Sequence, residues 1–333
     1  MTNRFAARLA HLAGVLATGG VLLAGLPGLA AAADAFPNRP VKLVVPYPPG
    51  GGTDVLARVI APKMGEALKQ SVVVENRGGA GGTIGTALVA QAPADGYTFL
   101  IINTVPHTSS AALYPALAYD PIKSFSAIGE IATVPYMLAV NPKVPAQTVQ
   151  EFIALAHAKP ASLNYGSAGN GSATHLAAEL FKSATKSNIT HVAYKGGGPA
   201  LTDLMAGQIQ ATFENVAALV PHVKAGTLRG LVITGSKRVG LFPTVPTMQE
   251  AGYAGFDVSG KFGLVVPAGT PPELIAQLNK ALNQALAAPE VVKQLASQGA
   301  EPVATTAGEF DQLMKRESDL WAKVIRDARI KND

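Results

Sequence analysis

Short runs of apolar, often β-branched residues alternate along this chain with longer stretches whose apolar positions recur at helical spacing. The first run, Val41–Val45, is followed by turn residues and then by Thr53–Lys69, where Val55, Val59 and Ile60 recur at the spacing of one helical face. Further strands are expected at Val72–Glu75, Thr98–Ile102, Leu163–Tyr165, Thr190–Ala193, Ile209–Glu214 and Leu228–Thr234, and helices at Thr83–Ala92, from about Ser172, from Pro199 and up to His222, with a polar loop after Ile102. This alternation predicts βαβ units and an α/β fold with mostly parallel sheets.

Two strand-like stretches with proline near their ends, Pro135–Pro145 and Asp257–Pro267, bracket a self-contained α/β block. A chain that crosses over, builds one domain and crosses back forms two lobes, with a cleft between them and two crossover strands as the hinge. We therefore expect one lobe from residues 34–140 plus 257–333 and a second lobe from residues 141–256. Helices in the last part of the chain are expected at Pro271–Leu286, Pro289–Gln298 and Ala307–Arg329.

The N-terminal segment, residues 1–33, has the pattern of a secretory signal peptide, because two arginines precede an uncharged apolar stretch and small residues follow it. Cleavage is expected after Ala33 or Ala35, which would place the mature protein in the periplasm of a Gram-negative cell. An uncharged stretch as long as Leu12–Ala33 is also sufficient to span a bilayer. Its proline and its alanine-rich end favour cleavage over an anchor.

Composition narrows the chemistry that this chain can perform. Its 333 residues include no cysteine, which excludes disulfides, thiolate metal sites, cysteine nucleophiles, iron–sulfur clusters and a lipid anchor on cysteine. The net charge is only +5 and no run of five basic residues occurs, so we expect no nucleic-acid partner. His175 and Glu179 lie one helical turn apart without an indicated third ligand, and we expect neither a metal nor a cofactor.

Glycine-rich loops between strands and helices carry the candidate chemistry. They are Pro46–Asp54 (PYPPGGGTD), Arg77–Thr83 (RGGAGGT), Gly166–His175 (GSAGNGSATH) and Tyr194–Pro199 (YKGGGP). In a parallel sheet such loops lie at the carboxyl ends of the strands, where ligands bind. Glycine lets the backbone approach a ligand, and the first N–H groups and the dipole of the following helix favour an anion. For any single loop a simple tight turn is the more common explanation, but two loops on each side of a cleft favour an anion site.

Two enzyme-like motifs have to be weighed against this interpretation. Gly79–Gly85 follows a strand and opens a helix, but its Gly-x-Gly-x-x-x-Gly spacing and the lack of an acid about 20 residues further on argue against a dinucleotide site. Tyr165–Gly169 is similar to a nucleophile elbow without its first glycine, and Ser167 would need a histidine as its base. The downstream candidates are His175, His191 and His222. An exported hydrolase-like enzyme therefore remains an alternative.

The same loops carry a resemblance to a known family. The segments are PYPPGGGTDVLAR (Pro46–Arg58), ENRGGAGGTIG (Glu75–Gly85), APADGYT (Ala92–Thr98), YDPIKSF (Tyr119–Phe125), YKGGGPALTDLMAGQI (Tyr194–Ile209), PHVKAGTLRGL (Pro221–Leu231), PTVPTMQEAG (Pro243–Gly252) and PAGTPPELI (Pro267–Ile275). In this order they resemble the periplasmic receptors of tripartite tricarboxylate transporters, the Bug family. The resemblance implies a two-lobed periplasmic binding protein fold of class II with a deep cleft between the lobes.

It also implies a function and partners. Such a receptor is a solute-binding protein and not an enzyme; it captures a small organic carboxylate by lobe closure and delivers it to a two-component membrane permease. We expect it to act as a monomer. A ligand sensor that feeds a signalling receptor would share the same binding chemistry and remains a second alternative.

The resemblance further implies which residues hold the ligand, largely through backbone groups and waters. In the first lobe they are Tyr47, Gly51, Gly52, Thr53 and Asp54, with Gly82, Thr83, Asn103, Thr104 and His107; in the second lobe they are Ser167, Asn170, Ser172, His175, Tyr194, Lys195, Glu214 and Asn215. Two departures bear on the identity of the ligand. The family often has Asp-Asn where this chain has Glu214-Asn215. It also often has an aromatic residue, commonly Trp, near Gly260-Lys261, where this chain reads SGKFG.

Overall fold

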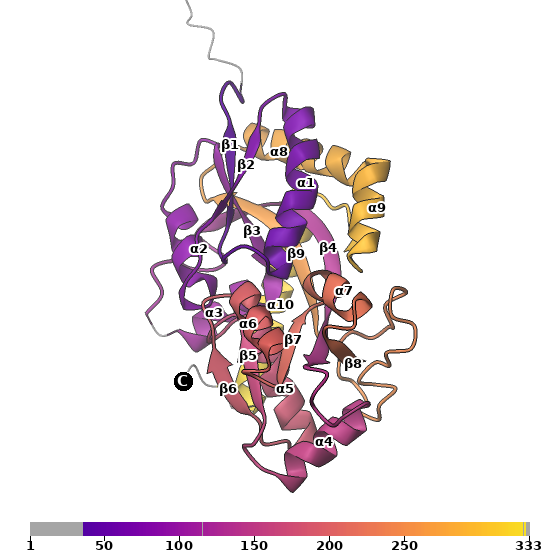
Figure 1. Cartoon of the computed structure of the whole chain (residues 1–333). Coiled ribbons are helices and arrows are strands. Elements are labelled where there is room, and N and C mark those ends of the chain that lie inside the picture. The colour runs from indigo at the N-terminus through magenta and orange to yellow at the C-terminus, as the bar shows by residue number, and fades with distance from the viewer. Residues whose placement is uncertain (1–35, 115, 329, 331–333) are drawn as a thin grey trace, which may run out of the picture. The chain divides into compact units, whose positions relative to one another are not determined.

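Strands and helices alternate through most of the chain, as the apolar pattern predicts (Figure 1). The computed structural model describes residues 36–114, 116–328 and 330, so the predicted signal peptide and both of its cleavage sites lie outside the described residues. The strands are β1 (Val41–Val45), β2 (Val72–Asn76), β3 (Thr98–Asn103), β4 (Phe125–Val140), β5 (Asn164–Ser167), β6 (Thr190–Ala193), β7 (Ala211–Asn215), β8 (Arg229–Ile233), β9 (Ser259–Pro267) and β10 (Glu301–Pro302). In this part of the chain no helix has the length and apolar character needed to cross a membrane.

The helices are α1 (Gly52–Leu68), α2 (Thr83–Ala90), α3 (Thr104–Leu113), α4 (Val149–Ala158), α5 (Ala173–Thr185), α6 (Gly197–Ala206), α7 (Val216–Lys224), α8 (Pro272–Ala287), α9 (Pro289–Ser297) and α10 (Ala307–Ala328), with a 3₁₀ turn at Ala80–Gly82. Four helices, α1, α2, α5 and α6, begin at the predicted glycine loops. The α/β class and nearly all predicted elements are therefore confirmed. We call β1–β3 with α1–α3 the first lobe, and β5–β8 with α4–α7 the second lobe.

The sheet is mixed, which corrects the prediction of mostly parallel pairing. The strand order is β2-β1-β3-β9-β4-β7-β5-β6, with β8 and β10 pairing with β4. Pairing is parallel where β1 meets β2 and β3, and where β5 meets β6 and β7. The pairs made by β4 and β9 are antiparallel. The physical reason is that the chain leaves the first lobe along β4 and returns along β9, so the two strands run in opposite directions.

Strand β4 connects the two lobes in one continuous element of 16 residues. Its first part, from Phe125 to Pro135, pairs with β9, and its last part, from Tyr136 to Val140, pairs with β7 and β8. Figure 1 shows β4 and β9 between the indigo first lobe and the red strands of the second. The first crossover thus begins earlier than the predicted stretch, because the residues before Pro135 are buried and continue the same ladder. The exact lobe boundaries stay a prediction.

Each lobe has apolar residues packed between its strands and helices. In the first lobe Leu43 on β1 and Ile60 on α1 are fully buried, and α1 packs against α8. In the second lobe Phe181 on α5 packs on Phe213 of β7, with ring centroids 5.1 Å apart. These packed layers hold the carboxyl ends of the strands, and therefore the glycine loops, in place.

The segment after β3 is helix α3 and not the polar loop that its composition predicts. Asn103 caps this helix by accepting a hydrogen bond from the Val105 N–H at 3.1 Å. The buried hydroxyls of Thr108 and Ser110 donate to carbonyl oxygens one turn earlier, those of Thr104 and His107, at 2.8 Å each. Because these bonds satisfy the hydroxyls inside the helix, polar residues are tolerated in a buried α3.

Candidate functional site

The glycine loops of the two lobes meet around a small buried space, the central cavity, of about 30 Å³. The first lobe and the crossover strands contribute Tyr47, Gly51, Gly52, Thr53, Asn103, Tyr136 and Phe262; the second lobe contributes Ala168, Ser172, Ala173, Thr174, Gly197, Glu214 and Asn215. This volume holds one or two water molecules. In this conformation the space is therefore smaller than a small organic acid.

Helix N-termini from both lobes face the central cavity. Helix α1 begins at Gly52 and α6 begins at Gly197, and both are preceded by glycine caps that offer no side-chain acceptor to the first N–H groups. Helix α5 is capped by Ser172, and α7 by Asn215, whose Oδ1 accepts from the Ala217 N–H at 2.8 Å. The first N–H groups of these helices together with the helix dipoles make this a region that favours negative charge.

A carboxyl group of the protein itself, that of Glu214, lies among these helix starts. Its Oε1 accepts a hydrogen bond from the Asn215 N–H at 2.8 Å, and the backbone of Gly52 donates a second one. A Cβ on Gly197 would lie 2.2 Å from Glu214 Oε2, so only glycine at that position leaves room for the carboxyl. Burial raises the pKa of Glu214 to about 7, although the two backbone hydrogen bonds act in the opposite direction.

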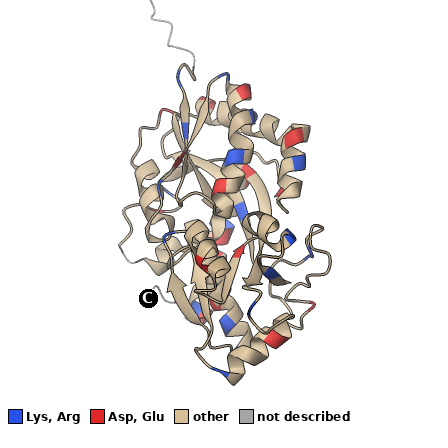
Figure 2. Ribbon diagram, viewed as in Figure 1, with Lys and Arg blue, Asp and Glu red and all other residues tan. Residues whose placement is uncertain are grey.

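One hydrogen-bond donor in the cavity wall has no partner. The Asn215 Nδ2 atom is buried and makes no hydrogen bond within the described residues, while its amide oxygen caps α7. Across the cavity, Asn103 Nδ2 donates to the Tyr136 hydroxyl. No lysine, arginine or histidine occurs among the described residues that line this cavity, and Figure 2 shows basic residues spread over the fold. An anion here would be held by amide and backbone donors and not by a cationic side chain.

A second small space, the side cavity, of about 20 Å³, lies next to the first and shares Tyr47 and Asn103 with it. Its lining also includes His107, whose Nε2 lies 2.7 Å from the carbonyl oxygen of Pro121. Burial lowers the pKa of His107 to about 4, so the ring is neutral at neutral pH. Because the Pro121 carbonyl can only accept, the neutral ring carries its proton on Nε2.

The two lobes are in direct contact around these cavities. The Tyr114 hydroxyl donates to the carbonyl oxygen of Asn170 in the second lobe. Within the first lobe, the Tyr47 hydroxyl donates to the Gly81 carbonyl at 2.9 Å. A Cβ on Gly81 would lie 2.2 Å from the Asn170 oxygen, and Gly81 has a φ of 64°, a conformation that favours glycine. The structure is therefore that of a closed cleft, and glycine permits the close approach of the loops.

Eleven of the predicted ligand residues line these two spaces. The central cavity includes Tyr47, Gly51, Gly52, Thr53, Asn103, Ser172, Glu214 and Asn215, and the side cavity adds Gly82, Thr83 and His107. Asp54, Thr104, Ser167, Asn170, His175, Tyr194 and Lys195 line neither. The first group comes together because the N-termini of helices from both lobes point to one place.

Several of the remaining predicted residues have structural partners instead. The Asp54 carboxylate accepts from the Gly50 N–H at 3.1 Å and from Arg58 Nε at 3.0 Å. The Tyr194 hydroxyl donates to Asp203 at 2.7 Å. Lys195 is exposed.

Three others lie in or beside helices near the cleft. Thr104 is the first residue of α3, and its buried hydroxyl has no hydrogen-bond partner within the described residues. Asn170 contacts Tyr114 across the lobes through its backbone oxygen. His175 Nδ1 accepts from the Gly171 N–H at 3.1 Å, which stabilises the loop at the start of α5.

Ser167 pairs with a histidine, as the hydrolase alternative requires, but it is not placed for catalysis. Its Oγ lies 2.6 Å from His191 Nε2 and also accepts from the Gly169 N–H at 3.1 Å. Ser167 is only 1% exposed and lines neither cavity. The His191 ring stacks on Tyr165 and on His175, at centroid distances of 4.9 and 4.3 Å. Ser167 is therefore buried in this conformation beside a half-buried histidine, and neither cavity reaches its hydroxyl.

Sequence reasoning missed several residues of the cavity walls. Tyr136 and Phe262 lie on the crossover strands β4 and β9. Gly197 lies in the loop Tyr194–Pro199, whose predicted ligand residues are only Tyr194 and Lys195. The rule that a helix start favours anions would have selected Gly197 in place of its neighbours. No sequence signal marks Tyr136 or Phe262, because their role depends on how the two crossover strands pair.

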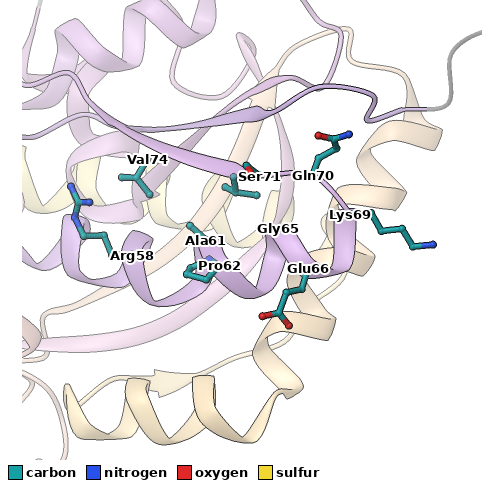
Figure 3. Close-up of a pocket in the computed structure, with 10 residues that line it drawn as sticks. Arg58, Ala61, Pro62, Gly65, Glu66, Lys69, Gln70, Ser71 and Val74 are labelled. Atoms are coloured by element: carbon teal, nitrogen blue, oxygen red, sulfur yellow. The ribbon is translucent and has the colours of Figure 1, made fainter.

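A larger hollow, a groove of about 770 Å³, lies elsewhere, between α1 and the edge strand β2 (Figure 3). It is lined by Arg58, Ala61, Pro62, Gly65, Glu66, Lys69, Gln70, Ser71, Val72 and Val74. It is open to solvent along its length, none of the predicted ligand residues lines it, and the side chains of Glu66 and Lys69 extend away from it. A site that buries a small ligand is enclosed and has convergent polar groups, and the central cavity fits that description better. Within the described residues, no cluster of three or more histidines or acids is suited to a metal.

Comparison with known proteins agrees with this geometry. Residues 56–330 match the family described as tripartite tricarboxylate transporter family receptor. The protein BugT of Bordetella pertussis is 40% identical over 320 residues, which cover 95% of this chain and 98% of BugT.

Solved structures give the same result. That of Rhodopseudomonas palustris Rpa4515 with adipate has a TM-score of 0.86 at 38% identity and covers 89% of this chain and 99% of that one. That of MatC from the same species with bound malate has a TM-score of 0.84 at 34% identity and covers 87% and 100%. These likenesses confirm the predicted two-lobed periplasmic binding protein fold.

Proposed function

Because this chain belongs to the family of tripartite tricarboxylate transporter receptors, we propose that it is a periplasmic receptor that captures a small organic carboxylate and delivers it to a two-component membrane permease. The family is one of transport receptors and not of enzymes. The buried position of Ser167 gives no support to a hydrolase.

The observation that carries the carboxylate assignment is the set of donors around the central cavity. The starts of α1 and α6 direct backbone N–H groups to it, and Asn215 Nδ2 is a buried donor without a partner. A buried donor without an acceptor costs free energy, about 1–3 kcal/mol, which a ligand oxygen would restore. Two similar structures contain dicarboxylates, adipate and malate, which supports the same ligand class here.

The mechanism is capture by lobe closure. The lobes, residues 34–140 plus 257–333 and residues 141–256, would move about β4 and β9, and the ligand would bind between the loops of both. A ligand shifts such an equilibrium only through contacts that it makes in the closed state and not in the open one. Contacts from α1 on one side and from Asn215 on the other meet this condition, because they belong to different lobes.

Backbone recognition also explains how an anion is held without arginine or lysine. A carboxylate that leaves water loses its hydration, and this cost is offset only when its oxygens accept several hydrogen bonds. Helix N-termini supply those donors in fixed positions, so little side-chain entropy is lost on binding.

The test is a panel of mono-, di- and tricarboxylates, with adipate and malate among them, measured by thermal unfolding of the mature protein. A ligand at one hundred times its Kd should add about 2.7 kcal/mol to the free energy of unfolding. The matched control is the neutral diamide of adipic acid, which has the same length and no charge. Stabilisation by the diamide or by a sugar, with none by any carboxylate, would contradict the proposal. Recovery of the ligand unchanged after incubation with stoichiometric protein separates a receptor from an enzyme.

A further inference from the structure

The proposed function leaves one group unexplained, because the site for an anionic ligand contains the buried carboxyl of Glu214. This side chain is 4% exposed and lines the central cavity beside Asn215. It lies among three helix starts: the backbone of Gly52 at α1 and that of Asn215 at α7 donate to it, and Gly197 of α6 packs against its Oε2. The position is thus one that a ligand carboxylate would favour for the same physical reasons.

Among the residues that the structure describes, no unpaired lysine or arginine lines the cavity beside Glu214. Titratable or charged groups on the elements around it include Tyr47 before α1, Asp54 and Arg58 on α1, His107 on α3, Tyr136 on β4, His175 on α5, Lys195 before α6, and the pair of Lys261 on β9 with Glu317 on α10. The lysines and the arginine among them are paired with another carboxylate or exposed to solvent. Arg58 bonds to Asp54, Lys261 Nζ lies 2.6 Å from Glu317 Oε1, and Lys195 is exposed. Burial raises the pKa of both Tyr47 and Tyr136, so both hydroxyls are neutral.

Two carboxylates in one buried site without a cation repel each other, and such pairs normally share one proton. The ligand is fully ionised at neutral pH, whereas Glu214 already holds its proton more tightly than an exposed glutamate. A second negative charge beside it strengthens that hold further. A neutral acid, unlike a carboxylate, is also a donor, and an O–H to carboxylate bond is one of the stronger hydrogen bonds in proteins.

We propose that Glu214 binds the ligand as a neutral acid, so that the receptor takes up one proton from water together with each carboxylate that it captures. When Glu214 is ionised before binding, one Glu214 carboxylate, one proton from water and one ligand carboxylate combine to form one complex. In that complex the Glu214 O–H donates to the ligand, and the ligand keeps its charge. This inference rests on the proposed function and specifies the protonation of the same site.

The proposal has a quantitative consequence for pH. Free Glu214 is mostly ionised at pH 8 and mostly protonated at pH 6, because burial raises its pKa to about 7. Proton uptake should therefore be about 0.9 per ligand at pH 8 and about 0.1 at pH 6. The affinity for the ligand should fall by up to about tenfold for each pH unit above pH 7. Below about pH 6 the Kd should stay constant.

The experiment is isothermal titration calorimetry of the mature protein with adipate and with malate at pH 6 and pH 8. Each titration is run in phosphate and in Tris, since the difference between the two buffer ionisation enthalpies gives the number of protons taken up. Glu214→Gln keeps the shape and a donor but cannot ionise, and it should show no uptake and a Kd that does not change between pH 6 and pH 8. The matched control is Glu130→Gln, a buried carboxyl on β4 whose pKa burial also raises but which lines neither cavity; it should retain the uptake of the natural protein.

The outcomes separate this inference from the proposed function. Binding of either acid without proton uptake at pH 8 overturns the inference and leaves the carboxylate receptor intact. Loss of affinity in Glu214→Gln together with absent uptake in the natural protein would mean that Glu214 is ionised and accepts from a ligand hydroxyl or ammonium. Failure of every carboxylate in the panel to bind contradicts the proposed function itself. The measurement on the natural protein decides the question even when the variant does not fold.

Discussion

His107 provides a direct test of how the buried site responds to acid. The ring is 5% exposed, its Nε2 contacts the Pro121 carbonyl at 2.7 Å, and its edge packs on Phe125 with centroids 5.1 Å apart. Burial lowers its pKa from 6.5 to about 4, with the hydrogen bond to Pro121 acting in the opposite direction. The folded protein therefore binds a proton at this ring more weakly than the unfolded chain does.

The sign and size of the effect follow from that difference. A histidine with a lowered pKa in the folded state contributes stability above the unfolded pKa of 6.5, and this contribution is lost as pH falls toward 4. The loss amounts to about 2 kcal/mol at pH 5 and about 3 kcal/mol at pH 4. The free energy of unfolding of the natural protein should thus fall by this amount between pH 7 and pH 4. A variant with a non-ionisable residue at position 107 should not show this loss.

The assay is urea unfolding of the natural protein and of His107→Gln at pH 7, 5 and 4, without ligand. Glutamine keeps an N–H donor for Pro121, so its packing cost is a constant offset, and the informative quantity is the change in the difference between the two proteins. His191 also has a pKa lowered to about 4 by burial, but it is present in both proteins and cancels. If the difference between the natural protein and His107→Gln is the same at pH 7 and pH 4, folding does not lower the pKa of His107 and the reasoning is wrong.

Further substitutions test the closed cleft and its donors. Gly81→Ala places a Cβ 2.2 Å from the Asn170 oxygen and should weaken carboxylate binding at least tenfold by calorimetry, on top of about 1 kcal/mol of backbone strain. Gly226→Ala is its matched control, because Gly226 has a similar φ of 71° and no atom within 4 Å; equal loss of affinity in both would refute a role for lobe contact. Asn215→Asp keeps the cap of α7 but replaces the unpartnered donor by an acceptor, so it should reduce adipate affinity with little change in urea unfolding; an unchanged Kd would show that Nδ2 does not meet the ligand. Ser167→Ala should lower the free energy of unfolding by about 1 kcal/mol and leave ligand affinity unchanged, and loss of binding would contradict its assignment to the interior.

Local pattern was sufficient for most of the secondary structure. Alternation of short apolar runs with helical spacing located β1, β2, β6 and α1 almost to the residue, because each element buries a face whose period is visible along the chain. It failed at α3, whose threonines and serines are typical of a loop; the hydroxyls of Thr108 and Ser110 instead donate to carbonyls of the same helix. It also failed on strand direction, since the antiparallel pairing of β4 and β9 depends on partners far apart in the sequence.

For the candidate site, too, some features could be predicted from local sequence and others could not. The glycine loops and the preference for an anion could be predicted from local chemistry. A glycine N-cap has no side chain that could accept hydrogen bonds from the first N–H groups of the helix. Resemblance added Glu214 and Asn215. Neither source distinguished Gly197, which contacts the Glu214 carboxyl, from Tyr194, whose hydroxyl bonds to Asp203.

By itself, then, the sequence determined the α/β class, the helix starts at the glycine loops, the absence of cysteine chemistry and the family of the receptor. Only the tertiary structure decided which loop residues face one another, that Ser167 is buried beside His191, and that Glu214 lies among three helix starts. The physical reason is that periodicity and capping act between residues a few positions apart. Burial, pKa and unpartnered donors instead depend on atoms that the crossover strands bring together from both lobes.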